Sequence, residues 1–143
     1  MSRQPTCFGP SANVVIVVDA SAVIEILLSR SVGVRVRDRI FRAGEKLNVP
    51  QLLDVEVLQV IRRYTLAGLM AGSRAEEAIA RYREMEIERY SHELLFDRIW
   101  QLRFNVTAYD AAYVALAELL GTRLVTTDRR LAKAAPHVAE LIQ

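Results

Sequence analysis

The sequence predicts an α/β fold, a three-layer α/β/α sandwich around a mainly parallel central sheet. Strand-like and helix-like segments alternate along the chain, the order that builds parallel sheets. The first strand, Val14 to Val18, is β-branched at every residue, so both of its faces should be covered. The length of 143 residues fits one domain. We expect an N-terminal extension over residues 1–13 and a single domain over 14–143.

Turn and cap residues divide the first half of the chain. Ser21 can cap the helix that follows the first strand, and Gly33 interrupts the apolar pattern before a second helix. Pro50 fits the first turn of a longer helix. We expect a helix over 22–28, a helix over 34–43, a strand over 47–49 and a helix from 50 to 68.

The second half combines helical spacing with one alternating segment. Ser73 and Glu76 have the spacing of a capping box. Met85, Ile87 and Arg89 alternate with three glutamates, which suits a short strand with one solvated face at or near a sheet edge. Gly121 ends an Ala-rich helix. We expect helices over 73–83, 94–103, 107–120 and 129–135, and strands over 85–89, 124–126 and 138–142.

Composition excludes several classes of protein. The formal net charge is +2, hydrophobic residues make up 52% of the chain, and the longest aliphatic run is far shorter than a bilayer span. Residues 1–13 have no apolar core of a secretion signal, so we expect a cytoplasmic protein. Cys7 is the only cysteine, which excludes an intrachain disulfide and a thiolate zinc cluster.

Four acidic residues lie where a hydrophobic segment ends or a helix begins: Asp19, Glu56, Asp110 and Asp128. In open parallel sheets, ligand sites lie beyond the carboxyl ends of the strands, where all four side chains could meet. Carboxylates brought together repel one another unless protons or a divalent cation neutralise them. The spacing therefore predicts an anionic site at one edge of the sheet.

Each acid also has a purely structural interpretation. Asp19, Asp110 and Asp128 could cap helices, and taken singly capping is favoured for Asp110 and Asp128. Glu56 lies beyond the first turn of an apolar helix, so capping leaves it unexplained. Asp54 is the rival acid on that helix, but it lies roughly 200° around the axis from Glu56. The two cannot serve the same cavity.

The ligand chemistry indicates a hard cation. Carboxylates without cysteine or a neighbouring histidine suit Mg²⁺ or Mn²⁺ and not zinc or copper. His92 and His137, the only histidines, are better explained as surface residues. No nucleophile–base pair and no glycine-rich phosphate loop is visible, so a metal-activated water would cut a phosphodiester.

Four motifs in order carry a family resemblance: Val-Val-Asp-Ala-Ser-Ala-Val at 17–23, Pro-x5-Glu at 50–56, Thr-x-Tyr-Asp-Ala-x-Tyr at 107–113 with Ala-Leu-Ala-Glu at 115–118, and Val-Thr-Thr-Asp-x-x-Leu at 125–131. Together they resemble the PIN-domain ribonucleases, and most of all the VapC toxins of type II toxin–antitoxin systems. The resemblance implies a metal-dependent endoribonuclease that inhibits translation or growth. It also implies a homodimer and a VapB-type antitoxin that covers the site.

The same resemblance assigns roles to residues. The metal-binding and catalytic set would be Asp19, Glu56, Asp110 and Asp128. Ser21 and Thr127 would support the acids by holding a carboxylate or a metal-bound water. Cations for the RNA backbone could come from arginines, although a solvated helix face explains each of them equally well: Arg62, Arg63, Arg103, Arg129 and Arg130.

Two other functions stay open at this point. A binding module of PIN fold could keep the acids to dock a basic partner without cutting RNA. A receiver-like phosphotransfer domain would need a lysine near the last strand, whereas Lys133 lies inside the predicted final helix. Tyr109 and Tyr113 neighbour Asp110, and tyrosines on an Ala-rich helix are more often core or dimer contacts.

Overall fold

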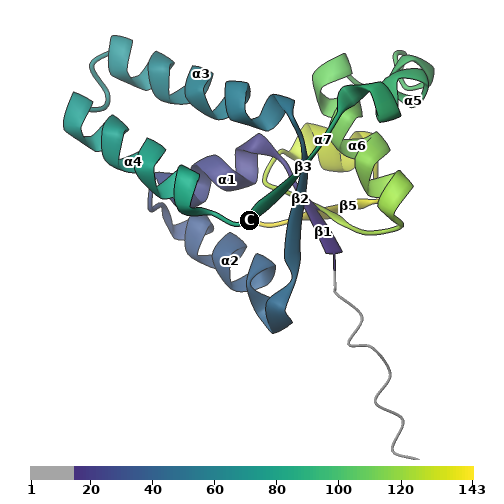
Figure 1. The fold of residues 1–143 in the computed structure, drawn as a ribbon, viewed down its shortest axis with the longest axis horizontal. Coiled ribbons are helices and arrows are strands. Elements are labelled where there is room, and N and C mark those ends of the chain that lie inside the picture. The colour runs from purple at the N-terminus through teal and green to yellow at the C-terminus, as the bar shows by residue number, and fades with distance from the viewer. Residues whose placement is uncertain (1–14) are drawn as a thin grey trace, which may run out of the picture.

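The central sheet has five strands, all parallel, in the order β3-β2-β1-β4-β5. The structure is a computed structural model and describes residues 15–143 (Figure 1). The expected extension over 1–13 and Cys7 lie outside the described residues. The strands are β1 (Val15–Val18), β2 (Lys46–Pro50), β3 (Ile87–Tyr90), β4 (Leu124–Thr126) and β5 (Ala139–Leu141). The predicted α/β/α class is confirmed, and β3 lies at an edge of the sheet as expected.

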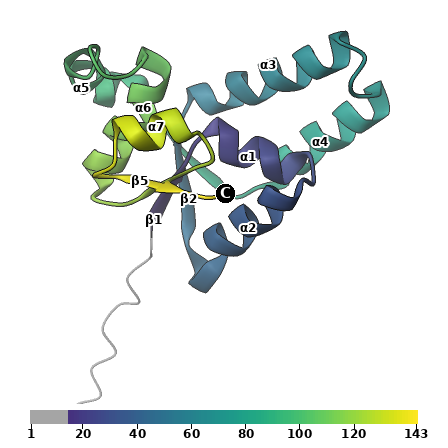
Figure 2. The same cartoon turned by 180° about the vertical axis from the view of Figure 1, so that it is seen from behind.

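Helices connect the strands and cover both faces. Figures 1 and 2 show α1 to α4 on one side of the sheet and α5 to α7 on the other. The helices are α1 (Ala20–Leu27), α2 (Ser31–Ile40), α3 (Leu52–Leu66), α4 (Gly72–Glu84), α5 (Phe96–Gln101), α6 (Ala108–Leu120) and α7 (Arg129–Ala134), with 3₁₀ turns η1 (Arg42–Gly44) and η2 (His92–Leu95). None of the helices in residues 15–143 combines the length and apolar character needed to span a bilayer.

The core is continuous from β1 to α6. Ile16, Val17 and Val18 are each no more than 1% exposed, which confirms that both faces of the first strand are covered. Residues 111–117 of α6 are all buried, because this helix lies against the middle of the sheet. Its small alanines let the helix approach β1 and β2 closely.

Three predicted helix starts differ from the structure. The cap of α1 is Asp19 and not Ser21, since Asp19 Oδ1 accepts a hydrogen bond from the Ala22 amide at 3.0 Å. Helix α4 begins at Gly72 with no side-chain cap, so Ser73 lies inside it. Pro50 ends β2 and pairs in register with Tyr90 instead of opening α3.

Gly33 lies inside α2, although the sequence favoured it as a break. A Cβ added at Gly33 would lie 2.1 Å from the carbonyl oxygen of Glu25 in α1. The glycine is therefore needed for the close crossing of α1 and α2, and not to end a helix.

Candidate active site

The four predicted acids come together beyond the carboxyl ends of the strands. Asp19 directly follows β1, and Asp128 lies two residues after β4, the neighbouring parallel strand. Strand order reverses at this pair, which is where parallel sheets place their ligand sites. Glu56 comes from α3 and Asp110 from the first turn of α6. Their charges act on one another, as the pKa shifts below show.

Asp19 lies at the centre of this arrangement and is only 5% exposed. Its Oδ1 accepts hydrogen bonds from the Ser21 hydroxyl at 2.7 Å and from the Ala22 amide at 3.0 Å. The Thr126 hydroxyl donates to its Oδ2. Burial raises the pKa of Asp19 to about 6; these hydrogen bonds oppose the shift, and the charge of Asp110 adds to it.

Thr126, which the sequence analysis missed, links the two strand ends. Its hydroxyl oxygen accepts a hydrogen bond from the Asp128 amide at 3.0 Å while the hydroxyl donates to Asp19. Thr127, the residue expected in this role, contributes its backbone amide, which donates to the Ser21 hydroxyl at 3.0 Å. The register pairs Val18 with Val125, so the next residues along, Asp19 and Thr126, also lie side by side.

Asp128 also caps a helix, as one interpretation of the sequence expected. Its Oδ1 accepts hydrogen bonds from the amides of Arg130 at 2.8 Å and Leu131 at 3.4 Å. Only that oxygen is engaged with α7. Capping and a place in the acidic cluster are therefore compatible at this position.

Glu56 and Asp110 are both partly buried, and each has a raised pKa. For Glu56 burial raises the pKa most, a hydrogen bond from the Tyr113 hydroxyl to Oε1 at 2.9 Å opposes it, and the charges of Asp110 and Asp19 raise it further. Burial is the largest cause of the raised pKa of Asp110, and the charge of Asp128 is the second. The Asp110 amide donates to the Thr107 hydroxyl at 3.2 Å, so the cap of α6 is Thr107.

The donor chemistry of this site fits a hard divalent cation, because the four acids are carboxylates, and three of them have raised pKa values: Asp19, Glu56 and Asp110. Among residues 15–143, no group of three or more His, Cys, Asp or Glu side chains has an arrangement that could hold a metal ion. Mg²⁺ needs only one or two carboxylates, because it keeps several waters and binds substrate phosphate. The site therefore suits an ion held by few protein ligands.

The predicted arginines have different positions. The charge of Arg130 lowers the pKa of Asp110, so this guanidinium lies near the acids. Arg103 lies over the rings of Trp100 and Phe104, with its Cζ 4.5 and 4.4 Å from the ring centroids. The remaining candidates are exposed on α3 and α7: Arg62, Arg63 and Arg129.

The histidines and Asp54 have structural roles. His92 Nε2 accepts a hydrogen bond from the Leu52 amide at 3.0 Å, so it helps to cap α3. His137 lies 2.8 Å from a carboxylate oxygen of Glu118. Asp54 pairs with Arg89 at 2.9 Å on the other side of α3, as its angle from Glu56 predicted.

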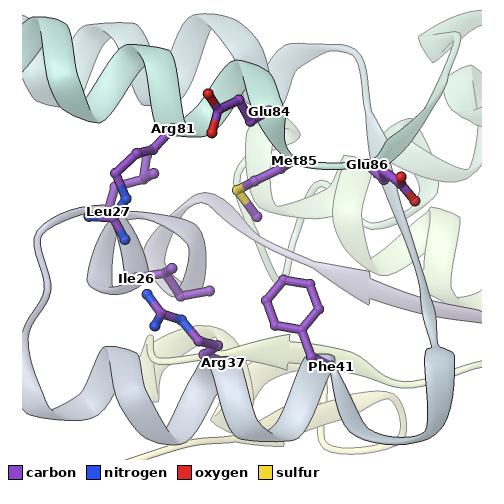
Figure 3. Close-up of a pocket in the computed structure, with 8 residues that line it drawn as sticks. All are labelled: Ile26, Leu27, Arg37, Phe41, Arg81, Glu84, Met85 and Glu86. Atoms are coloured by element: carbon purple, nitrogen blue, oxygen red, sulfur yellow. The ribbon is translucent and has the colours of Figure 1, made fainter.

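A separate pocket lies at the opposite end of α1. It has a volume of about 410 Å³ and is lined mainly by α1, α2, α4 and the segment before β3. Figure 3 shows Phe41 and Met85 pointing toward each other across it, with Arg37 and Arg81 at its rim. None of the four acids lines this pocket, so it is no part of the candidate active site.

Comparison with known proteins agrees with this geometry. Residues 16–136 match the family described as PIN domain. Ribonuclease VapC9 of Mycobacterium tuberculosis is 41% identical over 116 residues, which cover 81% of this chain and 87% of the relative. The chain is a PIN-domain protein of the VapC ribonuclease family.

Solved structures resemble this PIN domain in fold. The crystal structure of PAE2754 from Pyrobaculum aerophilum has a TM-score of 0.66 at 21% identity and covers 92% of this chain and 87% of its own. The crystal structure of VapBC2 from Rickettsia felis bound to a DNA fragment from their promoter has a TM-score of 0.64 at 9% identity. The match covers 91% of this chain and 100% of the VapBC2 chain. At these identities the likeness shows the PIN fold alone.

Proposed function

We propose that this PIN domain is a divalent-metal-dependent endoribonuclease and the toxin of a toxin–antitoxin pair. The observation that carries the proposal is the convergence of four acids at the switch point of a parallel sheet, with raised pKa values at Asp19, Glu56 and Asp110. The 41% identity to Ribonuclease VapC9 supports RNA as the substrate. A non-catalytic acidic groove is disfavoured because family and site chemistry agree.

Mg²⁺ or Mn²⁺ at this edge would be held by the carboxylates of Asp19, Glu56, Asp110 and Asp128, directly or through water. The bound ion supplies a water of lowered pKa and neutralises charge on a phosphoryl oxygen. The residues of the chain prepare the site for it. Ser21 and Thr126 fix the orientation of Asp19 through their hydroxyls.

The arginines near this edge would bind the RNA backbone. The charge of Arg130 lowers the pKa of Asp110, and Arg129 precedes Arg130 at the start of α7. Arg103 presents a guanidinium held against two aromatic rings. Unpaired bases stack on such aromatic and guanidinium planes, which favours single-stranded or looped RNA.

A VapB-type antitoxin and a second copy of the chain are the proposed protein partners. The names of the VapC relatives and the VapBC2 structure support the antitoxin. Exposed apolar side chains on α3, α5 and α6 support the homodimer, since a second copy could cover them: Val55, Leu58, Phe96, Trp100 and Tyr109. The cytoplasm, where RNA is accessible, is the proposed compartment.

A cleavage assay tests the proposed function. Single-stranded RNA is incubated with the purified chain in Mg²⁺ or Mn²⁺, in EDTA, and with the variants Asp19→Asn and Asp110→Asn. We expect EDTA to abolish cleavage and each variant to lose at least about 100-fold in rate, because each removes a carboxylate that would hold the ion opposite the phosphoryl oxygen. Asp38→Asn, an exposed acid on α2, is the matched control and should cleave normally. Cleavage that persists in EDTA and in both variants would contradict the proposal.

A further inference from the structure

Tyr113 connects α6 to the acidic site from inside the core. Its side chain is only 1% exposed, yet its hydroxyl donates a hydrogen bond to Glu56 Oε1 on α3 at 2.9 Å. It follows Asp110 by three positions, so both side chains lie on neighbouring parts of one face of α6. One helix thus carries an acid of the site and a contact to a second acid.

The contact has a consequence for the geometry of Glu56. A glutamate side chain on a helix has several rotatable bonds and loses conformational entropy when it is fixed. A tyrosine ring has two, and the packing around Tyr113 holds it in place. The hydrogen bond occupies Oε1, so Oε2 is the oxygen left for another ligand.

We infer that Tyr113 is a positioning residue of the nuclease site, which orients Glu56 so that a single carboxylate oxygen is presented to the divalent cation. The inference rests on the proposed function. Tyr113 does not touch the ion or the RNA in this account. It acts by keeping Glu56 in one conformation before the ion arrives, as residues that hydrogen-bond metal ligands do elsewhere.

The chain contains a matched control for this contact. The Tyr82 hydroxyl donates to Asp54 Oδ1 at 2.6 Å, from α4 to the same helix α3. Tyr82 is also buried, at 5% exposure. Because Asp54 is paired with Arg89 away from the acidic cluster, Tyr82→Phe removes an equivalent bond without changing the site.

The test compares Tyr113→Phe, Tyr82→Phe and the wild type in two assays, Mn²⁺ binding by titration calorimetry without RNA and the Mn²⁺ dependence of RNA cleavage. Tyr113→Phe should weaken Mn²⁺ binding about 10-fold, the smaller effect typical when a metal ligand loses its hydrogen-bond partner. Saturating Mn²⁺ should restore most of kcat in this variant. Tyr82→Phe should match the wild type in both assays. Urea unfolding checks that the two variants lose similar stability.

A second comparison tests whether Tyr113 acts through Glu56. In a Glu56→Gln background, adding Tyr113→Phe should change Mn²⁺ binding no further, because the orienting effect has lost its carboxylate. Unchanged Mn²⁺ binding in Tyr113→Phe, equal weakening by Tyr82→Phe, or an additive loss in the double variant would each overturn the inference while wild-type cleavage stands. A wild type that neither binds Mn²⁺ nor cuts RNA would overturn the proposed function and this inference with it.

Discussion

Helix α3 carries two carboxylates in nearly the same local setting but with opposite electrostatics. Asp54 and Glu56 each accept a hydrogen bond from a tyrosine hydroxyl. The Arg89 guanidinium also donates to Asp54 and, with the bond from Tyr82, lowers its pKa despite partial burial. Within residues 15–143 no cation pairs with Glu56, and burial together with its acidic neighbours raises its pKa. The fold supplies a counter-charge to one acid and withholds it from the other.

The difference shows how to separate a structural acid from a functional one. A carboxylate that the fold neutralises contributes to stability and needs nothing further. A carboxylate that the fold buries beside other acids costs stability, and such sites persist where they bind or react. Glu56 belongs to the second class together with Asp19 and Asp110.

The largest expected effect of this difference is on catalysis. Glu56→Gln removes one of the carboxylates proposed to hold the ion, so RNA cleavage should fall by about 100-fold or more. Asp54→Asn removes a neutralised charge and should leave the cleavage rate within a factor of about 3. Single-turnover cleavage rates in saturating Mg²⁺ measure both. Equal losses in the two variants would remove the distinction between the two acids.

The next effect is on stability as a function of pH in the absence of metal. The pKa of Asp19 is about 6 in the folded chain against an ordinary 3.8, so the folded state binds its proton more tightly. The contribution of Asp19 to the free energy of unfolding should therefore be fully present below pH 3.8 and be lost as the pH rises through 6, by about 3 kcal/mol at most. The lowered pKa of Asp54 has the opposite effect on the free energy of unfolding. Its contribution is present above pH 3.8 and is lost as the pH falls below that value.

Urea unfolding at a series of pH values in EDTA measures this slope. Asp19→Asn should flatten it and should be more stable than the wild type at neutral pH. A wild type that gains stability from pH 4 to pH 6 would show that a different group dominates this range.

The smallest effect concerns the stability of the two variants on α3. Asp54→Asn weakens a partly exposed pair with Arg89, so it should cost about 1 kcal/mol. Glu56→Gln keeps an acceptor for Tyr113 and removes repulsion from Asp110 and Asp19, so stability in EDTA should stay equal or rise. Urea midpoints at pH 7 compare the two, and a larger loss in Glu56→Gln would reverse the assignment.

Much of the fold could be predicted because local patterns decide it. The aliphatic first strand, the alternation that marks β3 and the glycine after α6 each depend on neighbouring residues. Gly33 could not be predicted as a helical residue, because its role depends on how closely α2 crosses α1. A pattern along one helix contains no information about the distance to another.

The acids of the site could also be predicted from the sequence, whereas the hydrogen bonds between them and their neighbours could not. Asp19 and Asp128 are visible as acids at strand ends, and Glu56 as a charge in an apolar helix. Thr126 was missed because its role depends on β4 being the neighbour of β1. The sequence favours a core or dimer contact for Tyr113, and the residue does lie in the core, but its hydroxyl reaches an acid 57 positions away.

The pairing of β1 with β4 also bears on when this chain becomes active during its synthesis. The hydroxyl that orients Asp19 is 107 positions further along, and the strand that carries it cannot join the sheet until it has left the ribosome. Contacts so distant in sequence form late in folding. A nascent chain that ends before Leu124 lacks both Thr126 and Asp128. The cell that translates this message is thus exposed to the complete acidic cluster only after β4 and Asp128 have emerged.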